Sequence, residues 1–245
     1  MAGFVTCTGP ARAATFLFPE AQMLVQEWMT KEVITISPDT SMMKASRLMK
    51  DKKIRRLPVV DDDRKVVGII SDRDVKEASP SKATTLDMHE LYYLLSELKV
   101  KDIMTKNPVC ARENDSVEGV ALTMMERGFG GMPVVGENNK LAGIITESDI
   151  FRVLVTITGV RSGGMQLAFE LPNQRNTLRP ILDALRERGG TVISVLTSME
   201  SDEAPLRRVY IRLRPLTREQ EQAIVDDLKR DFPAMLYWEP GVSKS

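Results

Sequence analysis

The chain is poor in the residues from which most catalytic and disulfide-bonded sites are built. Of its 245 residues, two are cysteine, one is histidine and 5% are aromatic. Cys7 and Cys110 are far apart, which predicts neither a disulfide framework nor a zinc site and favours a reducing, cytoplasmic setting. His89 has neither a nucleophile nor a metal ligand at a suitable spacing. We therefore expect no enzyme, no catalytic residue and no metal site.

The chain also lacks any excess of charge and any long apolar run. Lysine plus arginine equals aspartate plus glutamate, at 34 each, so the sequence carries no electrostatic footprint for nucleic acid or an anionic membrane. No apolar run approaches the roughly 18–20 residues that span a bilayer. These absences argue against nucleic acids and membranes as partners.

What the sequence does contain is an internal repeat at an offset of 75 residues. Between residues 28–76 and 103–151, 13 of 49 aligned pairs are identical, several times the roughly 6% expected for unrelated residues. Three motifs recur in the same order: residues 28–31 with 103–106, residues 57–60 with 132–135, and residues 68–74 with 143–149. Such a repeat indicates the architecture before any single residue is interpreted.

Each repeat predicts the element order β-α-β-β-α. The elements of the first repeat are an extended opening segment Val33–Ile36, a helix Ser41–Lys52 capped by Asp39 or Thr40, strands Leu57–Val60 and Val66–Ile70, and a helix from Asp72. Their counterparts are Val109–Ala111, Ser116–Glu126, Met132–Val135, Leu141–Ile145 and a helix from Glu147. A unit of this size cannot bury both faces of its sheet, so we expect the two copies to pack together as one module.

The remaining segments have separate characters. Residues 1–22 are expected to be a disordered tail or an extension upstream of a start at Met23. The repeats are expected at 23–79 and 100–158, and residues 80–99 as a linker with a helix at Asp87–Leu98.

After Gly159 the pattern changes to β-α-β-β-α-β, the ferredoxin-like order, over residues 164–240. The predicted strands are Met165–Leu171, Thr191–Met199, Leu206–Leu213 and Met235–Trp238, and the predicted helices are Asn176–Arg188 and Thr217–Asp231. Gly189 and Gly190 are expected to end the first helix, and Thr217 with Gln220 to form a capping box on the second. The fold class is therefore predicted to be α+β.

The strand–turn–helix at the end of each repeat is the candidate binding feature. Ser71 or Thr146 follows a strand, and Asp74 or Asp149 lies three residues further on, inside a new helix. The N-terminus of a helix favours phosphate, and a carboxylate can accept both hydroxyls of a ribose. The same spacing also describes a capping box that needs no ligand, and both interpretations stay open.

These motifs resemble those of tandem CBS domains, over about residues 24–156. The resemblance rests on three motifs: Met29-Thr30 and Met104-Thr105, the Leu/Met-Pro-Val-Val strand, and the final Gly-hydrophobic-hydrophobic-Ser/Thr-x-x-Asp segment of each repeat. Residues 164–239 resemble an ACT domain, and the combination is similar to the acetoin-utilisation protein B family. The resemblance implies two clefts for adenosine-containing ligands such as AMP, ADP, ATP or S-adenosylmethionine. It implies no catalytic cofactor.

The resemblance also assigns residues to the clefts. Asp74 and Asp149 would hold ribose, and Ser71 and Thr146 would hold ribose or phosphate. The residues expected to line the base and the cleft walls are Val33, Thr35, Pro58, Val109, Cys110, Met132 and Pro133.

The repeats differ at one segment, where Lys53–Arg56 becomes Gly128–Gly131. Arg55 and Arg56, together with Arg73, are peculiar to the first repeat, and arginine forks suit phosphate oxygens. We hypothesise that these guanidiniums read phosphates in one cleft. In the other cleft the glycines would leave room for backbone approach or for the base. The alternative is that Arg55 and Arg56 are merely solvated.

The sequence therefore predicts a regulatory sensor of adenine nucleotides. Ligand binding would shift the conformation of the module, and a partner or the ACT-like domain would read that shift. The turn Pro172–Asn176 departs from the Asp-x-Pro-Gly-like turn of amino-acid-binding ACT domains, which favours dimerisation of the sheets there over an amino-acid ligand. The resemblance implies a homodimer formed through both the CBS helices and the ACT sheets. The alternative function is a structural dimerisation or interaction module without a small-molecule ligand.

Overall fold

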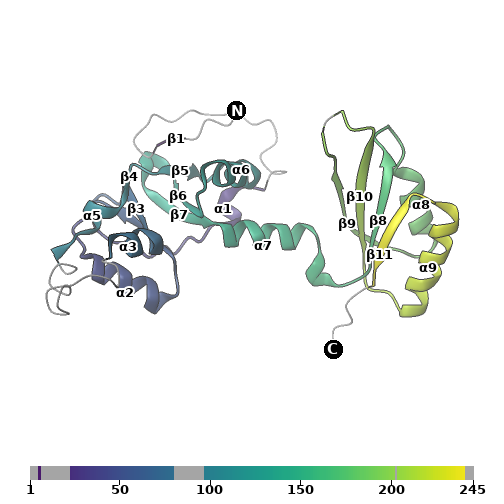
Figure 1. The fold of residues 1–245 in the computed structure, drawn as a ribbon, viewed down its shortest axis with the longest axis horizontal. Helices are drawn as coiled ribbons and strands as arrows, with labels where there is room; N and C mark the ends of the chain where they lie inside the picture. Colours follow the sequence, from purple (N-terminus) through teal and green to yellow (C-terminus); the bar gives the residue numbers. More distant parts are fainter. Residues whose placement is uncertain (1–4, 7–22, 80–96, 202, 241–245) are drawn as a thin grey trace. The chain divides into compact units, whose positions relative to one another are not determined.

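The computed structural model describes residues 5–6, 23–79, 97–201 and 203–240 (Figure 1). The chain divides into two compact units, residues 1–150 and residues 151–245. Most of the predicted tail and linker helix, together with Cys7 and His89, lies outside the described residues. Among the residues that the structure describes, no helix has the length and apolar character needed to cross a membrane. Helices and sheets occur together, which confirms the α+β class.

The two repeats have the predicted helices and paired strands. In the first repeat these are α2 (Met42–Lys52), β2 (Arg56–Val60), β3 (Val66–Ser71) and α3 (Asp72–Ala78). In the second they are β5 (Val109–Arg112), α6 (Val117–Arg127), β6 (Gly131–Val135), β7 (Leu141–Thr146) and α7 (Glu147–Ile157). The strands pair antiparallel as β2 with β3 and β6 with β7, and β5 joins β6 in parallel. The short elements are β1 (Val5–Thr6), paired with β5, and the 3-10 helix η2 (Glu137–Asn139).

The opening segment of the first repeat is not a strand, so that prediction is wrong. Only Ile36 bridges to β2, where its N–H donates to the Pro58 carbonyl at 3.2 Å and its carbonyl accepts from Val60 N–H at 3.0 Å. The chain then enters the turn at residues 38–40, which leaves no room for a longer ladder. The cap prediction is also wrong: Ser41, not Asp39 or Thr40, caps α2, because its Oγ accepts the N–H of Lys44 at 3.3 Å.

Each repeat completes the sheet of the other, so the two form one module. The segment around α1 (Val25–Trp28) brings Thr30 against Ile144 of β7, with N–H···O distances of 2.9 and 3.0 Å. Reciprocally, α5 (Val100–Ile103) leads into β4 (Thr105–Lys106), which pairs with β3. The sequence did not predict these two single-turn helices or the exchange.

Strand alternation gives each sheet two apolar faces. Leu57, Val59 and Ile70 face α2 and α3 in a core with Met42, Ala45 and Met49. On the other face, side chains from both repeats form a shared cluster of Val66, Cys110, Val135 and Leu141, with Val33 and Val60 at its margin. The inner face is therefore where the repeats meet.

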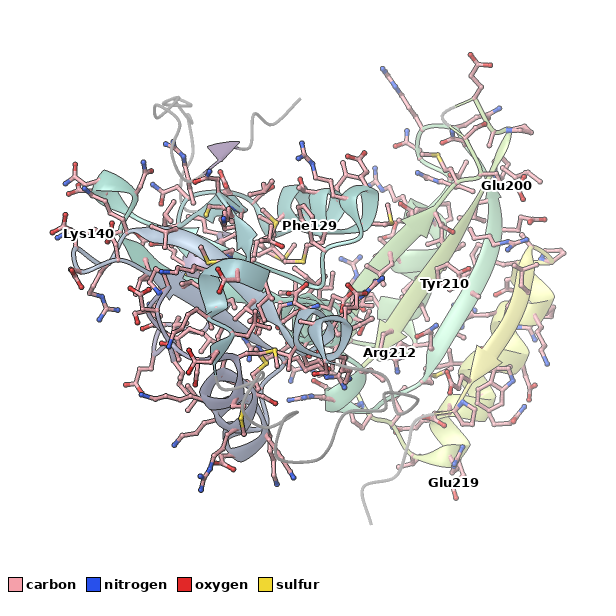
Figure 2. All side chains as sticks on the ribbon, turned by 60° about the vertical axis from the view of Figure 1, so that its left-hand side comes forward. Phe129, Lys140, Glu200, Tyr210, Arg212 and Glu219 are labelled. Carbon is pink, nitrogen blue, oxygen red and sulfur yellow. The ribbon has the colours of Figure 1, made fainter. Side chains whose placement is uncertain are left out.

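The second unit has the ferredoxin-like order. Its elements are the 3-10 helix η3 (Val160–Ser162), β8 (Gln166–Pro172), α8 (Arg179–Glu187), β9 (Val192–Ser198), β10 (Leu206–Leu213), α9 (Arg218–Asp231) and β11 (Met235–Glu239). The sheet is antiparallel throughout, in the order β11-β8-β10-β9, and α8 and α9 cover one face (Figure 1). Tyr210 and Arg212 project from the other face (Figure 2).

The helix ends of this unit follow backbone chemistry closely. The capping box is confirmed, since Thr217 Oγ1 accepts from Gln220 N–H at 3.3 Å and Gln220 Oε1 accepts from Thr217 N–H at 2.9 Å. Gly189, in the left-handed region at φ 78°, follows α8 as predicted. The predicted start of α8 at Asn176 is wrong by three residues, because Asn176 is itself left-handed at φ 62° and cannot lie in a right-handed helix.

Candidate ligand-binding site

The two Ser/Thr-x-x-Asp turns have the same geometry. In the first repeat, Oδ2 of Asp74 accepts hydrogen bonds from the N–H and the Oγ of Ser71, both at 2.7 Å. In the second, Oδ2 of Asp149 accepts from the N–H and the Oγ1 of Thr146, both at 2.8 Å. Asp74 is half-buried and Asp149 is 5% exposed. Each carboxylate is therefore fixed in orientation by its own helix start.

This geometry shows that Asp74 and Asp149 both cap the helices in which they lie. Ser71 and Asp74 form a complete capping box, with Asp74 N–H donating to Ser71 Oγ at 3.3 Å. The hydrogen bonds that Ser71 and Thr146 donate to the carboxylates end on Oδ2, and a carboxylate has a second oxygen that can also accept. Capping and ligand binding are therefore compatible at both turns.

Arg55 precedes β2, and Arg56 is the first residue of that strand. Arg55 is exposed on the side of α2 and α3. Arg56 lies across the second repeat, where an added Cβ at Gly130 would overlap its guanidinium and one at Gly131 would lie 3.2 Å from its Cδ. The same position at Gly131 is 3.2 Å from Cγ2 of Thr146, so Arg56 lies beside the second turn.

The glycines of the second repeat therefore make room for an arginine of the first. The sequence had predicted that Gly130 and Gly131 leave room for backbone approach or for the base, but the Arg56 side chain occupies that space. The sequence signal for this contact was that Arg55 and Arg56 of the first repeat correspond to Gly130 and Gly131 of the second.

The third arginine, Arg73, forms an ion pair on the surface of α3. The Nε of Arg73 donates to Oε1 of Glu77 at 2.7 Å, and the Arg73 side chain is 84% exposed. That hydrogen bond raises the pKa of Arg73. The ion pair with Glu77 thus occupies the Arg73 guanidinium.

Asp72 is a carboxylate that lies near Arg55 and Arg56. Its N–H donates to the Arg55 carbonyl at 2.9 Å, and its Oδ2 accepts from Lys76 Nζ at 2.9 Å. The Lys76 hydrogen bond lowers the pKa of Asp72, and the nearby charges of Arg55 and Arg56 lower it further. Asp72 is therefore held ionised beside the start of α3.

Several predicted cleft residues are inside the protein. Pro58, Cys110, Met132 and Pro133 are buried, whereas Val33, Thr35 and Val109 are half-buried. Val33 and Cys110 meet in the shared cluster, and β1 pairs with Val109 and Cys110. The structure thus brings together one predicted lining residue from each repeat, Val33 and Cys110.

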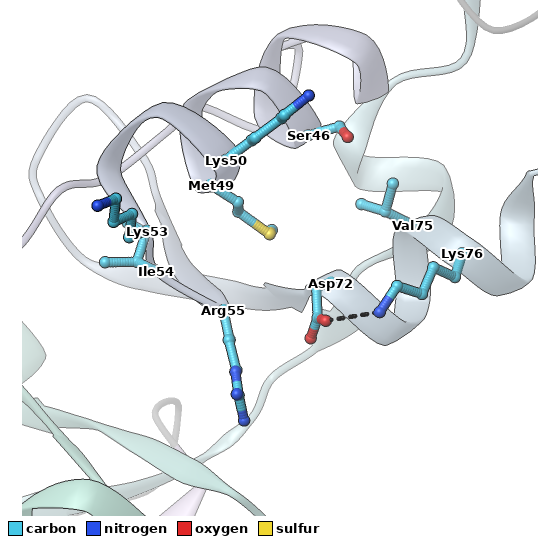
Figure 3. A pocket seen from close by; sticks show the side chains of 9 residues that line it. All are labelled: Ser46, Met49, Lys50, Lys53, Ile54, Arg55, Asp72, Val75 and Lys76. Atoms are coloured by element: carbon cyan, nitrogen blue, oxygen red, sulfur yellow. Dashed lines mark hydrogen bonds and ion pairs between the residues drawn. The ribbon is translucent and has the colours of Figure 1, made fainter.

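A groove between α2 and α3 lies apart from the two turns (Figure 3). Its volume is about 360 Å³, and its lining residues are Ser46, Met49, Lys50, Lys53, Ile54, Arg55, Asp72, Val75 and Lys76. We call it the α2–α3 groove. It includes Arg55 but neither Ser71 nor Asp74.

Comparison with known proteins identifies the first part of the chain. The family model described as "CBS domain" matches residues 25–81 and 100–156. A CBS domain-containing protein of Dictyostelium discoideum is 34% identical over 136 residues, which cover 56% of this chain and 94% of that protein. The chain belongs to the CBS-domain proteins, and the predicted tandem pair is confirmed.

Solved structures include other CBS pairs. The CBS-pair protein CBSX2 of Arabidopsis thaliana matches with a TM-score of 0.50 and 30% identity, covering 57% of this chain and 99% of that one. CBSX2 has also been crystallised in complex with AMP. An acetoin-utilisation protein of Vibrio cholerae matches with a TM-score of 0.48 and 26% identity, covering 57% of this chain and 96% of that one.

Other relatives are much longer proteins. An inosine-5'-monophosphate dehydrogenase of Methanocaldococcus jannaschii is 37% identical over 133 residues, which are 54% of this chain and 24% of the enzyme. The chain thus spans about a quarter of that relative's length.

Proposed function

We propose that the CBS pair is a non-catalytic regulatory sensor for an adenosine-containing ligand, with AMP as the reference compound. The observation that carries the proposal is the pair of equivalent turns, each presenting at the start of a helix a carboxylate whose orientation is fixed by hydrogen bonds to Oδ2. Support also comes from CBSX2, a 30% identical CBS pair known in complex with AMP.

Each cleft would use its turn in the same way. Asp74 or Asp149 accepts hydrogen bonds from the ribose hydroxyls, and the start of α3 or α7 attracts phosphate. Val33, Thr35 and Val109 contact the base, and Pro58, Cys110, Met132 and Pro133 form the wall behind it.

The two clefts would differ in how they read phosphate. Arg56 lies beside Thr146, so it serves the second cleft although it belongs to the first repeat. Arg55 lines the α2–α3 groove, and Arg73 is paired with Glu77. Phosphate selectivity is therefore assigned to the second cleft and to Arg56.

Ligand binding would act by population shift. Each repeat contributes to the sheet of the other, so a ligand that favours one arrangement of the turns biases the whole module. A partner protein or the ACT-like ferredoxin fold at residues 164–240 reads this bias.

The chain would act as a homodimer through its second unit. β9 is an edge strand of the sheet, and Val192–Ser198 contains neither charge nor proline, the usual devices that protect an edge. Val192 and Val195 are 37% and 36% exposed. Pairing of two β9 strands would cover them.

Ligand titration tests the sensor proposal. AMP, ADP, ATP and S-adenosylmethionine are titrated calorimetrically into the wild-type chain and into Asp74→Asn and Asp149→Asn variants. Asparagine keeps an oxygen for the cap but loses the charge and one acceptor. We expect binding that each variant weakens at one site and that raises the melting temperature.

A second function is favoured by the complete capping box of Ser71 and Asp74, which needs no ligand. In that case the CBS pair is a structural dimerisation module. Absence of any melting shift with all four adenosine compounds would support this function and exclude the sensor.

A further inference from the structure

The α2–α3 groove combines an apolar floor with a cationic rim. Met49 and Val75 are 4% and 8% exposed, and both point toward its middle (Figure 3). Lys50, Lys53, Arg55 and Lys76 lie around the rim, against one carboxylate, Asp72. Among the described residues, the structure pairs only Lys76 of these cations with a carboxylate, at 2.9 Å. The rim therefore carries an excess of positive charge.

The second repeat is an internal comparison for this charge. The residues 75 positions after Lys50, Lys53, Arg55 and Lys76 are Met125, Gly128, Gly130 and Phe151. None of these is charged, although both repeats build the same pair of helices. The fold therefore does not require cations at these positions.

Lys53 is also unfavourable for the helix that it ends. It occupies the left-handed C-cap position of α2 at φ 54°, where the second repeat has Gly128 at φ 67°. A residue with a Cβ is strained there and glycine is not. The helix dipole attracts cations to both C-termini, but it explains neither the choice of lysine over glycine nor Met125 in the second repeat.

We propose that the α2–α3 groove is a second binding site, specific to the first repeat, for a small organic anion with an apolar body. The apolar body packs on Met49, Ile54 and Val75. The anionic group lies among Lys50, Lys53 and Arg55, whose long side chains extend from the rim and can turn over the groove. Lys76 stays paired with Asp72 and closes the far side. This site does not depend on the adenosine clefts.

Octanoate is a suitable probe because it joins a carboxylate to an alkyl chain. It is titrated into the isotope-labelled full chain, and backbone amide shifts are followed by NMR, with 1-octanol and inorganic phosphate in parallel. We expect saturable shifts at residues 46–55 and 72–76. Octanoate should bind about tenfold more tightly than either control, because only octanoate uses both floor and rim.

The variants exchange residues between the repeats. Lys50→Met with Lys53→Gly should weaken octanoate about tenfold. Lys53→Gly alone should leave the melting temperature unchanged or raise it, because glycine relieves the left-handed position. Arg47→Leu is the matched control: it also installs the residue of the second repeat on α2, but at a position outside the groove, and should leave binding unchanged.

Three results would overturn the proposal. They are shifts that map elsewhere or do not saturate, equal binding by the double variant and the wild type, and equal affinity for octanoate and either control. Arg55 is left unchanged, and AMP titration of the same variants keeps this test separate from that of the adenosine clefts.

Discussion

Arg56 lies across the backbone of Gly130 and Gly131, and this contact changes how the difference between the repeats is understood. The sequence predicts that Arg55, Arg56 and Arg73 act together. At the scale of single residues they do not, because Arg55 lines the α2–α3 groove and Arg73 is paired with Glu77. Only Arg56 lies beside a turn of the opposite repeat.

Removal of Arg56 should affect phosphate recognition only. In the Asp74→Asn background, which isolates the second cleft, Arg56→Ala should weaken AMP about tenfold and leave adenosine unchanged, since a charge-assisted hydrogen bond to phosphate is lost. Calorimetry measures both ligands. Arg73→Ala is the control, and an unchanged ratio of AMP to adenosine affinity would show that Arg56 does not contact phosphate.

The glycines of the third motif should tolerate substitution unequally. An added Cβ at Gly68 would meet only the Met104 side chain, whereas one at Gly143 would meet Met29 and also lie 3.0 Å from the Thr30 carbonyl oxygen. A thioether can move and a paired backbone cannot, so Gly143→Ala should cost about 1–3 kcal/mol and Gly68→Ala less. Urea denaturation of both variants measures the difference, and equal costs would contradict this account.

At the scale of elements, most helices and strands are predictable because hydrophobic period and capping residues agree. β10 has the predicted bounds, and Thr217 caps α9 as its capping box indicates. The errors arise where tertiary context decides. Of residues 33–36 only Ile36 forms a bridge to β2, and Asn176 is left-handed before α8 begins. The α2–α3 groove was not predictable, because it requires two helices to be placed side by side.

Asp115, just before α6, gives a pH-dependent prediction. Burial raises the pKa of Asp115 above its ordinary value of 3.8, although the Arg112 N–H, donating at 2.7 Å, opposes that shift. The folded state then binds the proton more tightly than the unfolded state, so this group removes stability as pH rises through 3.8 and the raised folded pKa.

Asp115→Asn keeps an acceptor for Arg112 and removes the charge. The variant should therefore gain stability relative to wild type as pH rises from about 3 to 6. Urea denaturation at several pH values gives the difference between the two proteins. A difference that stays constant, or shrinks with rising pH, would contradict the assigned burial effect.

At the scale of the whole molecule, the repeat made the paired module predictable, and the family comparison confirms it for residues 25–81 and 100–156. The second unit has the predicted order of elements, β-α-β-β-α-β. The roles of the two turns were only half predictable, because capping and ligand binding use the same spacing of residues.

Homodimerisation through β9 can be tested by placing positive charges on that strand. Val192→Lys with Val195→Lys places ammonium groups on the exposed edge and should convert a dimer into a monomer. Sedimentation equilibrium measures the change. The control, Leu122→Lys with Met125→Lys on α6, alters two other exposed apolar residues. If only the control dissociates the dimer, the interface lies on the CBS helices and not on the sheet.

The exchange of Thr30 and Thr105 between the sheets has a consequence for synthesis on the ribosome. Thr30 is made early, but its partner Ile144 belongs to the last strand of the second repeat. The first repeat therefore cannot complete its backbone pairing until nearly the whole module has emerged. Chaperones would therefore meet a nascent chain in which Thr30 lacks its backbone partner until β7 has been synthesised.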